Sequence, residues 1–250
     1  MPTNAASHIQ RSAKLWTNPS SKRLKFVTVM TAYPPTAQGR TTRERLVAAA
    51  AQLIAERGAA GTSLDDVMAT ACASKSQLYH YFGDKHGLVE AVVEYQSAAV
   101  LGFQVRLLAS VNDWDDLERW ADAMVATVER QHARGGCPVG TLAASLADTD
   151  ESLRESLSDA FQAWRDAISG ALGRLRDNQL IARDADLEQL TTITLSAIQG
   201  GLLLAKTTRD SSQLRVALDG AIAHLRTHAP APAKRASKAR DADRNRRPRP

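Results

Sequence analysis

The 250-residue chain has only two cysteines, Cys72 and Cys137, so it has no disulfide framework and fits a reducing compartment. No apolar run approaches the roughly 20 residues that a membrane-spanning helix needs. The N-terminal residues also lack the uninterrupted apolar stretch of a secretory signal. Together these absences predict a cytoplasmic protein that does not enter a membrane.

Sequence patterns of enzymes and metal sites are missing as well. The chain has no G-x-S-x-G, no H-E-x-x-H, no phosphate-binding loop and no dinucleotide-binding glycine pattern. His224 and His228 are spaced i, i+4, but no third ligand is near, so we expect solvated histidines. The sequence therefore predicts no enzyme activity, no metal and no cofactor.

Acidic residues are absent from residues 1–39, which contain five Lys and Arg, and scarce in residues 230–250, which contain eight basic and two acidic side chains. Because the whole chain has a net charge of +5, residues 40–229 carry −6. Neither end shows helical periodicity, and Met30 leaves open a later start of translation. We expect two disordered basic arms, 1–39 and 230–250, which would add nonspecific phosphate affinity to a DNA-binding protein.

Between these ends the dominant signal is helical periodicity. Apolar residues recur at helical spacing between capping signals, and no alternation typical of strands persists. The pattern predicts an all-α protein of about nine helices: a three-helix domain over 40–87 and a helical bundle over 88–229. The expected helices cover residues 41–57, 64–71, 75–82, 85–109, 114–134, 138–147, 151–178, 187–206 and 212–228.

Residues 62–85 contain two short helical patterns back to back. Ser63 and Asp66 are spaced as a capping pair for the first pattern, and Ser74 is a second N-cap. The turn between them, 71–73, consists of small residues that let two helices cross closely. If its backbone needs a positive φ, Cys72 costs about 1 kcal/mol relative to glycine.

The second of these helices has one polar face. Leu78 and Phe82 lie one turn apart on the buried side, whereas Ser76 and His80 point away from them. Polar side chains with almost no acid offer hydrogen-bond donors and acceptors to base edges and phosphates. The same pattern also fits an ordinary surface helix.

The run Ser-Lys-Ser-Gln-Leu-Tyr-His-Tyr-Phe over 74–82, with the following Asp84-Lys85 and Leu88, resembles the recognition-helix signature of TetR-family transcriptional repressors. The resemblance covers residues 41–88. It departs from the family at Cys72, where glycine is usual, and at Ser76-Gln77, which should change the bases that are read. It implies that the side chains at the major groove and its phosphates are Ser74, Lys75, Ser76, Gln77, Tyr79, His80 and Tyr81. Contacts to the DNA backbone are expected from Thr42 and Arg43 at the start of the first helix, and from Ser63 and Lys85.

Residues 134–146 resemble the Gly-Cys-Pro-x-Gly-x-Leu-Ala segment of the LmrA- and YxaF-like branch of the same family. Cys137 precedes a helix N-terminus, where free amides lower a thiol pKa. Three roles stay open for Cys137: a small buried residue in a tight turn, a lining residue of a ligand pocket, or a thiol that senses electrophiles or oxidants.

The resemblance further implies that an effector binds in the C-terminal bundle. The candidate lining residues are Phe103, Trp120, Met124, Cys137, Phe161, Trp164 and Gln199. Aromatic residues at this spacing also fit a plain core. A pocket among them would take a largely apolar ligand with one or two polar anchors.

The last two helices, over 186–228, are apolar on more than one face, which indicates either a core position or a subunit contact. The resemblance favours a homodimer through these helices, with Gly200-Gly201 permitting close approach. A twofold dimer would place two recognition helices about one DNA turn apart on a palindromic operator.

We therefore expect a transcriptional regulator, most simply a repressor released from its operator by a small, largely apolar effector. Two alternatives remain at this point. One is a constitutive architectural protein that coats DNA through its basic tails, and the other is a repressor that senses electrophiles or oxidants through Cys137.

Overall fold

The computed structural model describes residues 34–230, and within this range it contains nine helices, α2 to α10, and no strand. The all-α prediction is confirmed. The two expected basic arms fall mainly on residues 1–33 and 231–250, which lie outside the described residues. None of the described helices is both long enough and apolar enough to cross a membrane.

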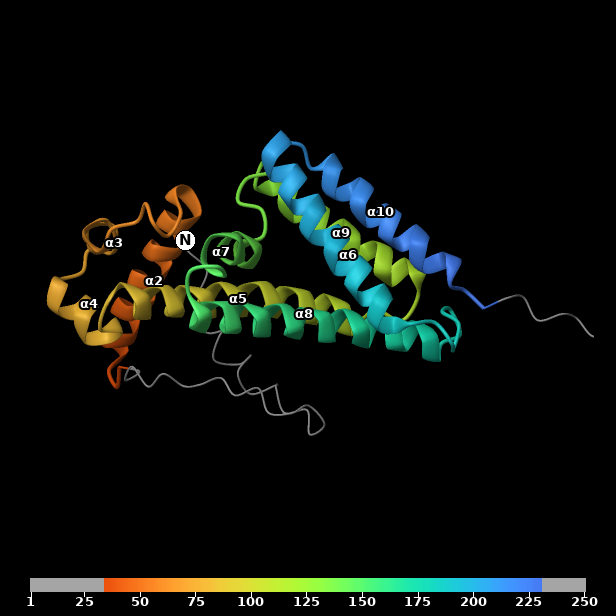
Figure 1. Ribbon diagram of the computed structural model, residues 1–250, viewed down its shortest axis with the longest axis horizontal. Helices are drawn as coiled ribbons and strands as arrows, with labels where there is room; N and C mark the ends of the chain where they lie inside the picture. Colours follow the sequence, from red (N-terminus) through yellow and green to blue (C-terminus); the bar gives the residue numbers. More distant parts are fainter. Residues whose placement is uncertain (1–33, 231–250) are drawn as a thin grey trace, which may run out of the picture.

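Three helices form one end of the molecule, which we call the head (Figure 1). They are α2 (Ala37–Arg57), α3 (Leu64–Ala71) and α4 (Lys75–Phe82). Leu46, Val67 and Leu78, one from each helix, have no exposed surface, so the three helices share one core. Burial of these side chains stabilises the head by roughly 1.5–3 kcal/mol each.

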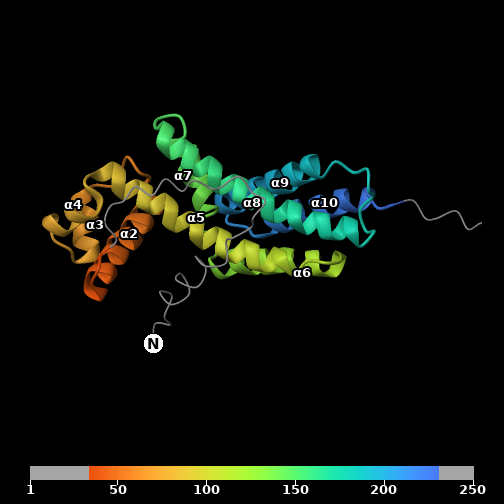
Figure 2. The ribbon, with the colours of Figure 1, turned by 90° about the horizontal axis from the view of Figure 1, so that it is seen from below.

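The remaining helices form a larger bundle, which we call the body. α5 (Lys85–Ala109) begins in the head and runs into the body beside α8 (Glu151–Asp177), as Figures 1 and 2 show. The far end of α8 is held by hydrogen bonds: Arg174 Nε donates to the Val111 carbonyl at 2.9 Å, and Asn178 Nδ2 donates to the Asn112 carbonyl at 2.9 Å. Because α5 is a single helix of 25 residues that begins in the head and ends in the body, it is a continuous link between them.

α6 (Trp114–Arg130), α9 (Leu187–Thr208) and α10 (Ser212–Thr227) pack together in the upper part of the body (Figure 1). Arg215 and Arg226 of α10 pair with Asp122 and Glu118 of α6, each at 2.7 Å. The short α7 (Pro138–Leu146) lies between the head and the rest of the body.

Two helix ends differ from the sequence predictions by four residues each. α2 begins at Ala37 rather than at residue 41, because the Thr36 hydroxyl accepts a hydrogen bond from the Gly39 amide at 3.1 Å and caps the helix earlier. α6 ends at Arg130 rather than at residue 134, because His132 and Ala133 both adopt a φ of 51°. The helix-terminating turn therefore precedes the glycine pair that the sequence suggested.

Candidate nucleic-acid interface and effector region

The turn between α3 and α4 has the geometry that the sequence suggested. Ser63 caps α3, with its hydroxyl accepting a hydrogen bond from the Asp66 amide at 3.1 Å. Cys72 has φ 48° and ψ 50°, which is the left-handed region that favours glycine. The condition under which Cys72 costs about 1 kcal/mol relative to glycine, a positive φ, is therefore met.

The N-terminus of α4 is capped by a reciprocal pair of hydrogen bonds. The Ser74 hydroxyl accepts from the Gln77 amide at 3.2 Å, and the Gln77 side-chain oxygen accepts from the Ser74 amide at 2.9 Å. This capping box satisfies two amides that the first helical turn leaves free. It also fixes the side chain of Gln77 on the exposed side of the helix start.

The outer face of α4 is polar and exposed. Tyr79 is 44% exposed, and the Lys75 ammonium lies 5.8 Å from the centre of its ring. The opposite face is buried, since Leu78 and Phe82 are 0% and 3% exposed. The exposed face is formed by Lys75, Ser76, Gln77, Tyr79 and His80, and we call it the α4 face.

Two residues expected at the DNA are instead part of the head's core. Tyr81 is 7% exposed and packs edge-on against the rings of its chain neighbours. Thr42 is 4% exposed, and its hydroxyl donates to the Gln38 carbonyl at 3.0 Å. Because α2 starts four residues earlier than expected, Thr42 lies in its second turn rather than at its open end.

The remaining residues expected at the DNA backbone lie at the surface of the head. Ser63, Ser74 and Lys85 are exposed at the starts of α3, α4 and α5. Arg43 is half-buried, with its guanidinium carbon 5.3 Å from the centre of the Phe82 ring. This stacking holds Arg43 against the end of α4.

The junction between α4 and α5 is tightly packed. Asp84 caps α5 by accepting a hydrogen bond from the Gly87 amide at 2.9 Å. A Cβ atom on Gly87 would clash with the backbone carbonyl of Phe82, at the end of α4. Sequence reasoning missed Gly87, because a glycine inside a helical pattern does not by itself show which neighbour it packs against. The recognition-type helix α4 is thus fixed directly to α5.

Comparisons with known proteins agree with this head-and-body arrangement. Residues 46–92 match the family model "Bacterial regulatory proteins, tetR family", and residues 114–220 match "Transcriptional regulator LmrA/YxaF-like, C-terminal domain". A helix-turn-helix transcriptional regulator from the lacX 3′ region of Lactococcus lactis is 31% identical over 189 residues, or 72% of this chain and 91% of that protein. The chain belongs to the TetR family.

Other TetR-family proteins show the same relationship. The Bacillus subtilis regulator LmrA is 27% identical over 174 residues, which cover 69% of this chain and 90% of LmrA. The crystal structure of Escherichia coli NemR in its reduced form superposes with a TM-score of 0.64 at 27% identity, covering 77% of this chain and 98% of NemR. A TetR regulator from Rhodobacter sphaeroides, at 19% identity and a TM-score of 0.67 over 74% of this chain and 98% of that one, shares the fold.

In this TetR-family chain the expected effector-lining residues are distributed over five helices of the body. Trp120 and Met124 of α6 and Trp164 of α8 are buried, whereas Phe103 of α5 and Phe161 of α8 are half-buried. The Trp120 indole donates to Gln104 Oε1 at 2.9 Å in the interior. Trp120 also lines a pocket of about 220 Å³, which the structure places beside Leu107, Ser110, Asp116 and Arg119.

Several buried polar atoms in the body have no hydrogen-bond partner. Trp164 Nε1 and Thr191 Oγ1 belong to residues that are 2% and 1% exposed. Ser97 Oγ on α5 and Gln199 Nε2 on α9 share this property. Leaving such an atom unpaired costs about 1–3 kcal/mol. These four atoms lie on α5, α8 and α9, so the body contains polar groups that a ligand could satisfy.

Cys137 is 8% exposed and lies at the start of α7, with its thiol beside the Gln199 side chain of α9. The Gly140 amide donates to its sulfur at 3.3 Å, and a Cβ on Gly140 would lie 2.7 Å from Gln199 Oε1. Burial raises the pKa of the Cys137 thiol, against smaller opposing effects of the Gly140 amide, the Gln199 side chain and the Val139 backbone. The expectation that the helix N-terminus lowers this pKa is wrong, because desolvation outweighs it.

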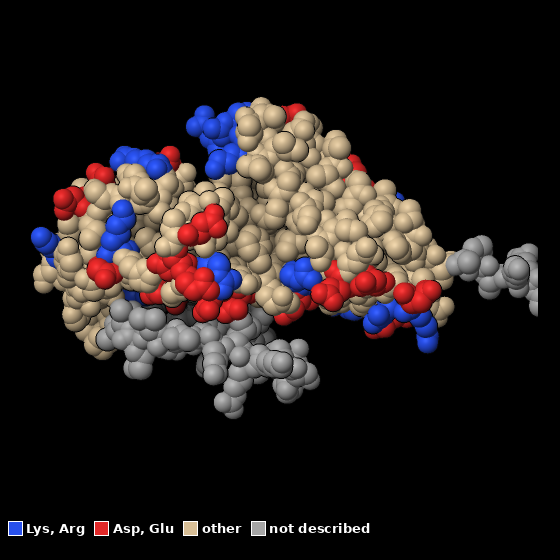
Figure 3. Space-filling view, in the orientation of Figure 1, with Lys and Arg blue, Asp and Glu red and all other residues tan. Residues whose placement is uncertain are grey.

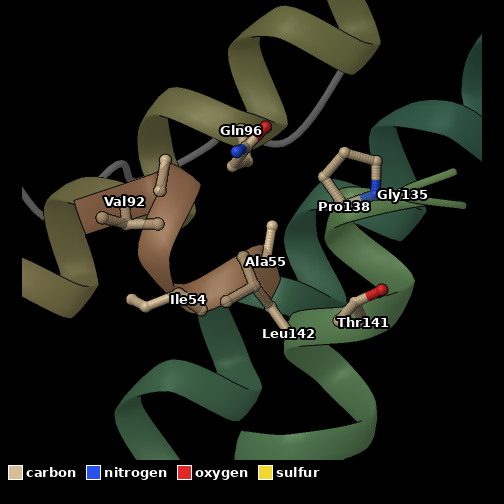
Figure 4. Close-up of a pocket in the computed structure, with 9 residues that line it drawn as sticks. Ile54, Ala55, Val92, Gln96, Gly135, Pro138, Thr141 and Leu142 are labelled. Carbon is tan, nitrogen blue, oxygen red and sulfur yellow. The ribbon is translucent and has the colours of Figure 1, made fainter. Parts of the chain in front are cut away.

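A second, small pocket lies at the junction of head and body (Figure 4). It has a volume of about 60 Å³ and lies between α2 and α7, and Gln96 of α5 also lines it. None of the expected effector-lining residues borders it. Its lining consists of Ala51, Ile54, Ala55, Val92, Gln96, Gly135, Pro138, Thr141 and Leu142.

The last two helices present exposed apolar side chains. Leu203 and Leu204 of α9 are 64% and 51% exposed, and Val216 of α10 is 70% exposed. The expected role of the glycine pair is split: a Cβ on Gly201 would lie 2.9 Å from Leu214 Cδ1 of α10 in the same chain, whereas Gly200 faces open space. Gly201 thus packs closely against α10 of its own chain.

At the end of α10, the rings of His224 and His228 lie edge-on with their centres 5.1 Å apart. Within residues 34–230 no group of three or more His, Cys, Asp or Glu side chains is placed to hold a metal ion.

Proposed function

We propose that this TetR-family regulator is a repressor, which binds a palindromic operator as a homodimer and is released by a small, largely apolar effector. The observation that carries the proposal is the α4 face, an exposed row of polar side chains on a helix whose other side is fully packed. The relatives NemR of Escherichia coli and DhaR of a Mycobacterium are named repressors, which supports repression rather than activation for this chain.

The α4 face supports operator reading for a physical reason. Its side chains offer an ammonium, a hydroxyl, an amide, a phenol and an imidazole, and it contains no carboxylate to repel phosphates. Such groups form hydrogen bonds to base edges in the major groove and to the flanking phosphates. The capping box and the packed α4–α5 junction hold the helix rigid, which lowers the entropy lost on binding.

Replacement of one tyrosine tests the assignment. Tyr79→Ala removes the largest exposed side chain of the α4 face and should weaken operator binding by roughly 5- to 150-fold, as expected for loss of a contact worth about 1–3 kcal/mol. The matched control is Tyr95→Ala, because Tyr95 is a similarly exposed tyrosine, at 40%, on α5. Both variants should keep the oligomeric state of the wild type. An unchanged operator affinity of Tyr79→Ala would show that α4 does not read the DNA.

The proposed dimer contact is the exposed apolar surface of α9 and α10. Three large aliphatic side chains on the two helices are more than half exposed, and open space at Gly200 allows close approach of a second chain. Burying such side chains against a symmetry mate gives a favourable hydrophobic contribution. A twofold arrangement would then present both α4 faces to one side of the DNA.

The proposed effector acts by population shift. The unpaired polar atoms on α5, α8 and α9 support a ligand that is apolar over most of its surface and carries hydrogen-bonding groups for them. A ligand that favours one arrangement of these helices would tilt α5, and the head attached to it, away from operator spacing. The pocket between α2 and α7 leaves room for such a movement.

Two alternatives make different predictions. If the chain is an architectural protein that acts through its basic ends, removal of residues 1–33 and 231–250 should abolish DNA binding. The repressor should keep sequence-specific binding with a shallower salt dependence. If Cys137 is a sensor, Cys137→Ser should abolish operator release by oxidants, but the buried thiol with its raised pKa favours a packing role.

A further inference from the structure

A histidine at the start of α5 joins the head to the body. His86 Nε2 lies 3.2 Å from Glu90 Oε1 on the same helix, and His86 Nδ1 lies 2.9 Å from Asp150 Oδ2. Asp150 is the N-cap of α8, and its other oxygen accepts a hydrogen bond from the Leu153 amide at 3.0 Å. Ser152 completes the group by donating to Glu90 Oε1 at 3.2 Å. We call these four side chains the His86 cluster.

Both ring nitrogens of His86 face carboxylate oxygens, which accept hydrogen bonds but cannot donate them when ionised. A neutral imidazole has one N–H group and can donate to only one of the two carboxylates. The imidazolium has two and can donate to both. The complete cluster therefore requires a protonated His86, and loss of that proton breaks one of its two contacts.

The cluster is attached to the DNA-reading helix through the backbone. His86 lies beside Gly87, which packs directly against the end of α4, so the position of the first turn of α5 fixes the position of α4. On the other side, Asp150 is fixed to the first turn of α8, which runs beside α5 and contacts α9. The cluster thus connects the first turn of α5, beside the end of α4, to the first turn of α8 in the body.

We propose that His86 is a positioning residue for operator binding, which holds the α4 face in its binding orientation most firmly when the imidazole is protonated. The inference rests on the proposed function and adds a regulation by pH to it. It predicts that affinity for the operator is lower with a neutral imidazole at position 86 than with a protonated one, because the neutral ring can donate to only one of the two carboxylates.

The charges around the cluster are mainly acidic. On α5 the neighbours are Lys85, Glu90 and Glu94, and Arg43 of α2 acts on Glu94. From α8 the charged groups at the same end are Asp150, Glu151 and Arg154, and Glu151 pairs with Arg154 at 2.6 Å. Figure 3 shows acidic side chains gathered on the face where α5 and α8 run side by side. No basic side chain is paired with Asp150 or Glu90 apart from His86 among the ion pairs of the described chain.

The test compares three chains that differ only at position 86: the wild type, His86→Gln and His86→Arg. Gln is neutral at every pH, whereas Arg keeps a charged, multiply donating group at every pH. Affinity is measured at pH 6 and pH 8 for a duplex selected from random DNA by the wild type. Every other side chain, including His80 on the α4 face, is the same in all three chains, so differences between their pH profiles report position 86 alone.

We expect the wild type to lose about two- to fivefold more operator affinity between pH 6 and pH 8 than either variant, which is the size expected for a partly exposed ion pair. His86→Arg should bind more tightly than His86→Gln at pH 8. Identical pH profiles of the three chains, or equal affinities of the two variants at pH 8, would overturn the positioning role.

A second measurement needs no DNA. At pH 6, amide hydrogen exchange in residues 85–90 and 150–153 should be faster in His86→Gln than in the wild type, because the cluster is broken. Equal exchange would show that the cluster is not closed in solution, which also overturns the inference. If the wild type selects no duplex at all, the proposed function itself fails, whatever the exchange shows.

Discussion

Replacing Cys72 by glycine should stabilise the protein, which is unusual for a substitution within a folded domain. Cys72 holds a left-handed backbone conformation, with φ 48° and ψ 50°, at the end of α3. This conformation costs a residue with a Cβ atom about 1–2 kcal/mol. Glycine avoids that cost but loses about 0.5–1 kcal/mol more conformational entropy on folding.

The side chain of Cys72 contributes little that glycine would remove. It is exposed, and its thiol makes only a weak 3.8 Å contact to the Ala69 carbonyl. The net gain is therefore about 0.5–1 kcal/mol in the free energy of unfolding. For a chain of this size that corresponds to an increase of about 1–4 °C in the midpoint of thermal unfolding.

The assay is thermal unfolding followed by far-ultraviolet circular dichroism, at one fixed protein concentration because dimerisation also stabilises the fold. The control is Ala69→Gly, three residues earlier, on the exposed side of the right-handed helix α3. It should destabilise the protein by about 1 kcal/mol, since glycine disfavours a helix interior. A lower unfolding midpoint for Cys72→Gly than for the wild type would refute the reasoning.

Three further predictions follow from the packing. Gly87→Ala should lower both the stability of the fold and the affinity for the operator, because the added Cβ clashes with the Phe82 carbonyl. Its control is Gly102→Ala in the same helix, which meets no atom within 4 Å and should be neutral or slightly stabilising. The two variants are compared by thermal unfolding and by DNA titration. Val216→Glu should convert the dimer to a monomer in sedimentation analysis, with the helix content unchanged. Iodoacetamide should label the exposed Cys72 well before the buried Cys137, as followed by mass spectrometry.

The raised thiol pKa of Cys137 also gives stability a pH dependence. The folded chain holds this proton more tightly than the unfolded chain, whose thiol titrates near about 8.5. The associated stability is complete below that pH and is lost as the pH rises through the folded-state pKa. The free energy of unfolding of the wild type, measured with denaturant, should therefore decrease more steeply above about pH 8.5 than that of Cys137→Ala. Parallel pH profiles would contradict the burial of the thiol.

Much of the fold could be predicted from the sequence because it is encoded locally. Ser74 and Asp84 cap the helices that they were expected to cap, and α5 has the predicted bounds, Lys85–Ala109. Capping and helical periodicity depend on residues a few positions apart, which a sequence shows directly. Local signals also existed for two features of the head that differ from the predictions. Thr36 stands three residues before Gly39, which is the spacing of an N-cap and accounts for the earlier start of α2. Tyr81 is spaced i+3 from Leu78, which places it on the buried side of α4.

Other features depend on residues that are distant in sequence, and no pattern indicated them. The direction of the Cys137 pKa follows from burial against α9, whereas the sequence showed only the helix N-terminus that follows Cys137. The contact between His86 and Asp150 joins the first turns of two different helices. For the effector region, four of the seven residues named from the sequence are buried and three are half-buried, but the sequence could not show which of their polar atoms lack hydrogen-bond partners.

The clash that any side chain at Gly87 would cause has a consequence for how specificity can change in evolution or in the laboratory. Because α4 is attached to the rest of the head through its buried side chains and through the backbone contact at Gly87, its outward side chains take no part in that attachment. New residues at positions 76, 79 and 80 could therefore retarget the protein to another DNA sequence while leaving its mechanical connection to the body unaltered. The side chains that contact DNA and the contacts that attach the helix to the body are therefore separable parts of the same short segment.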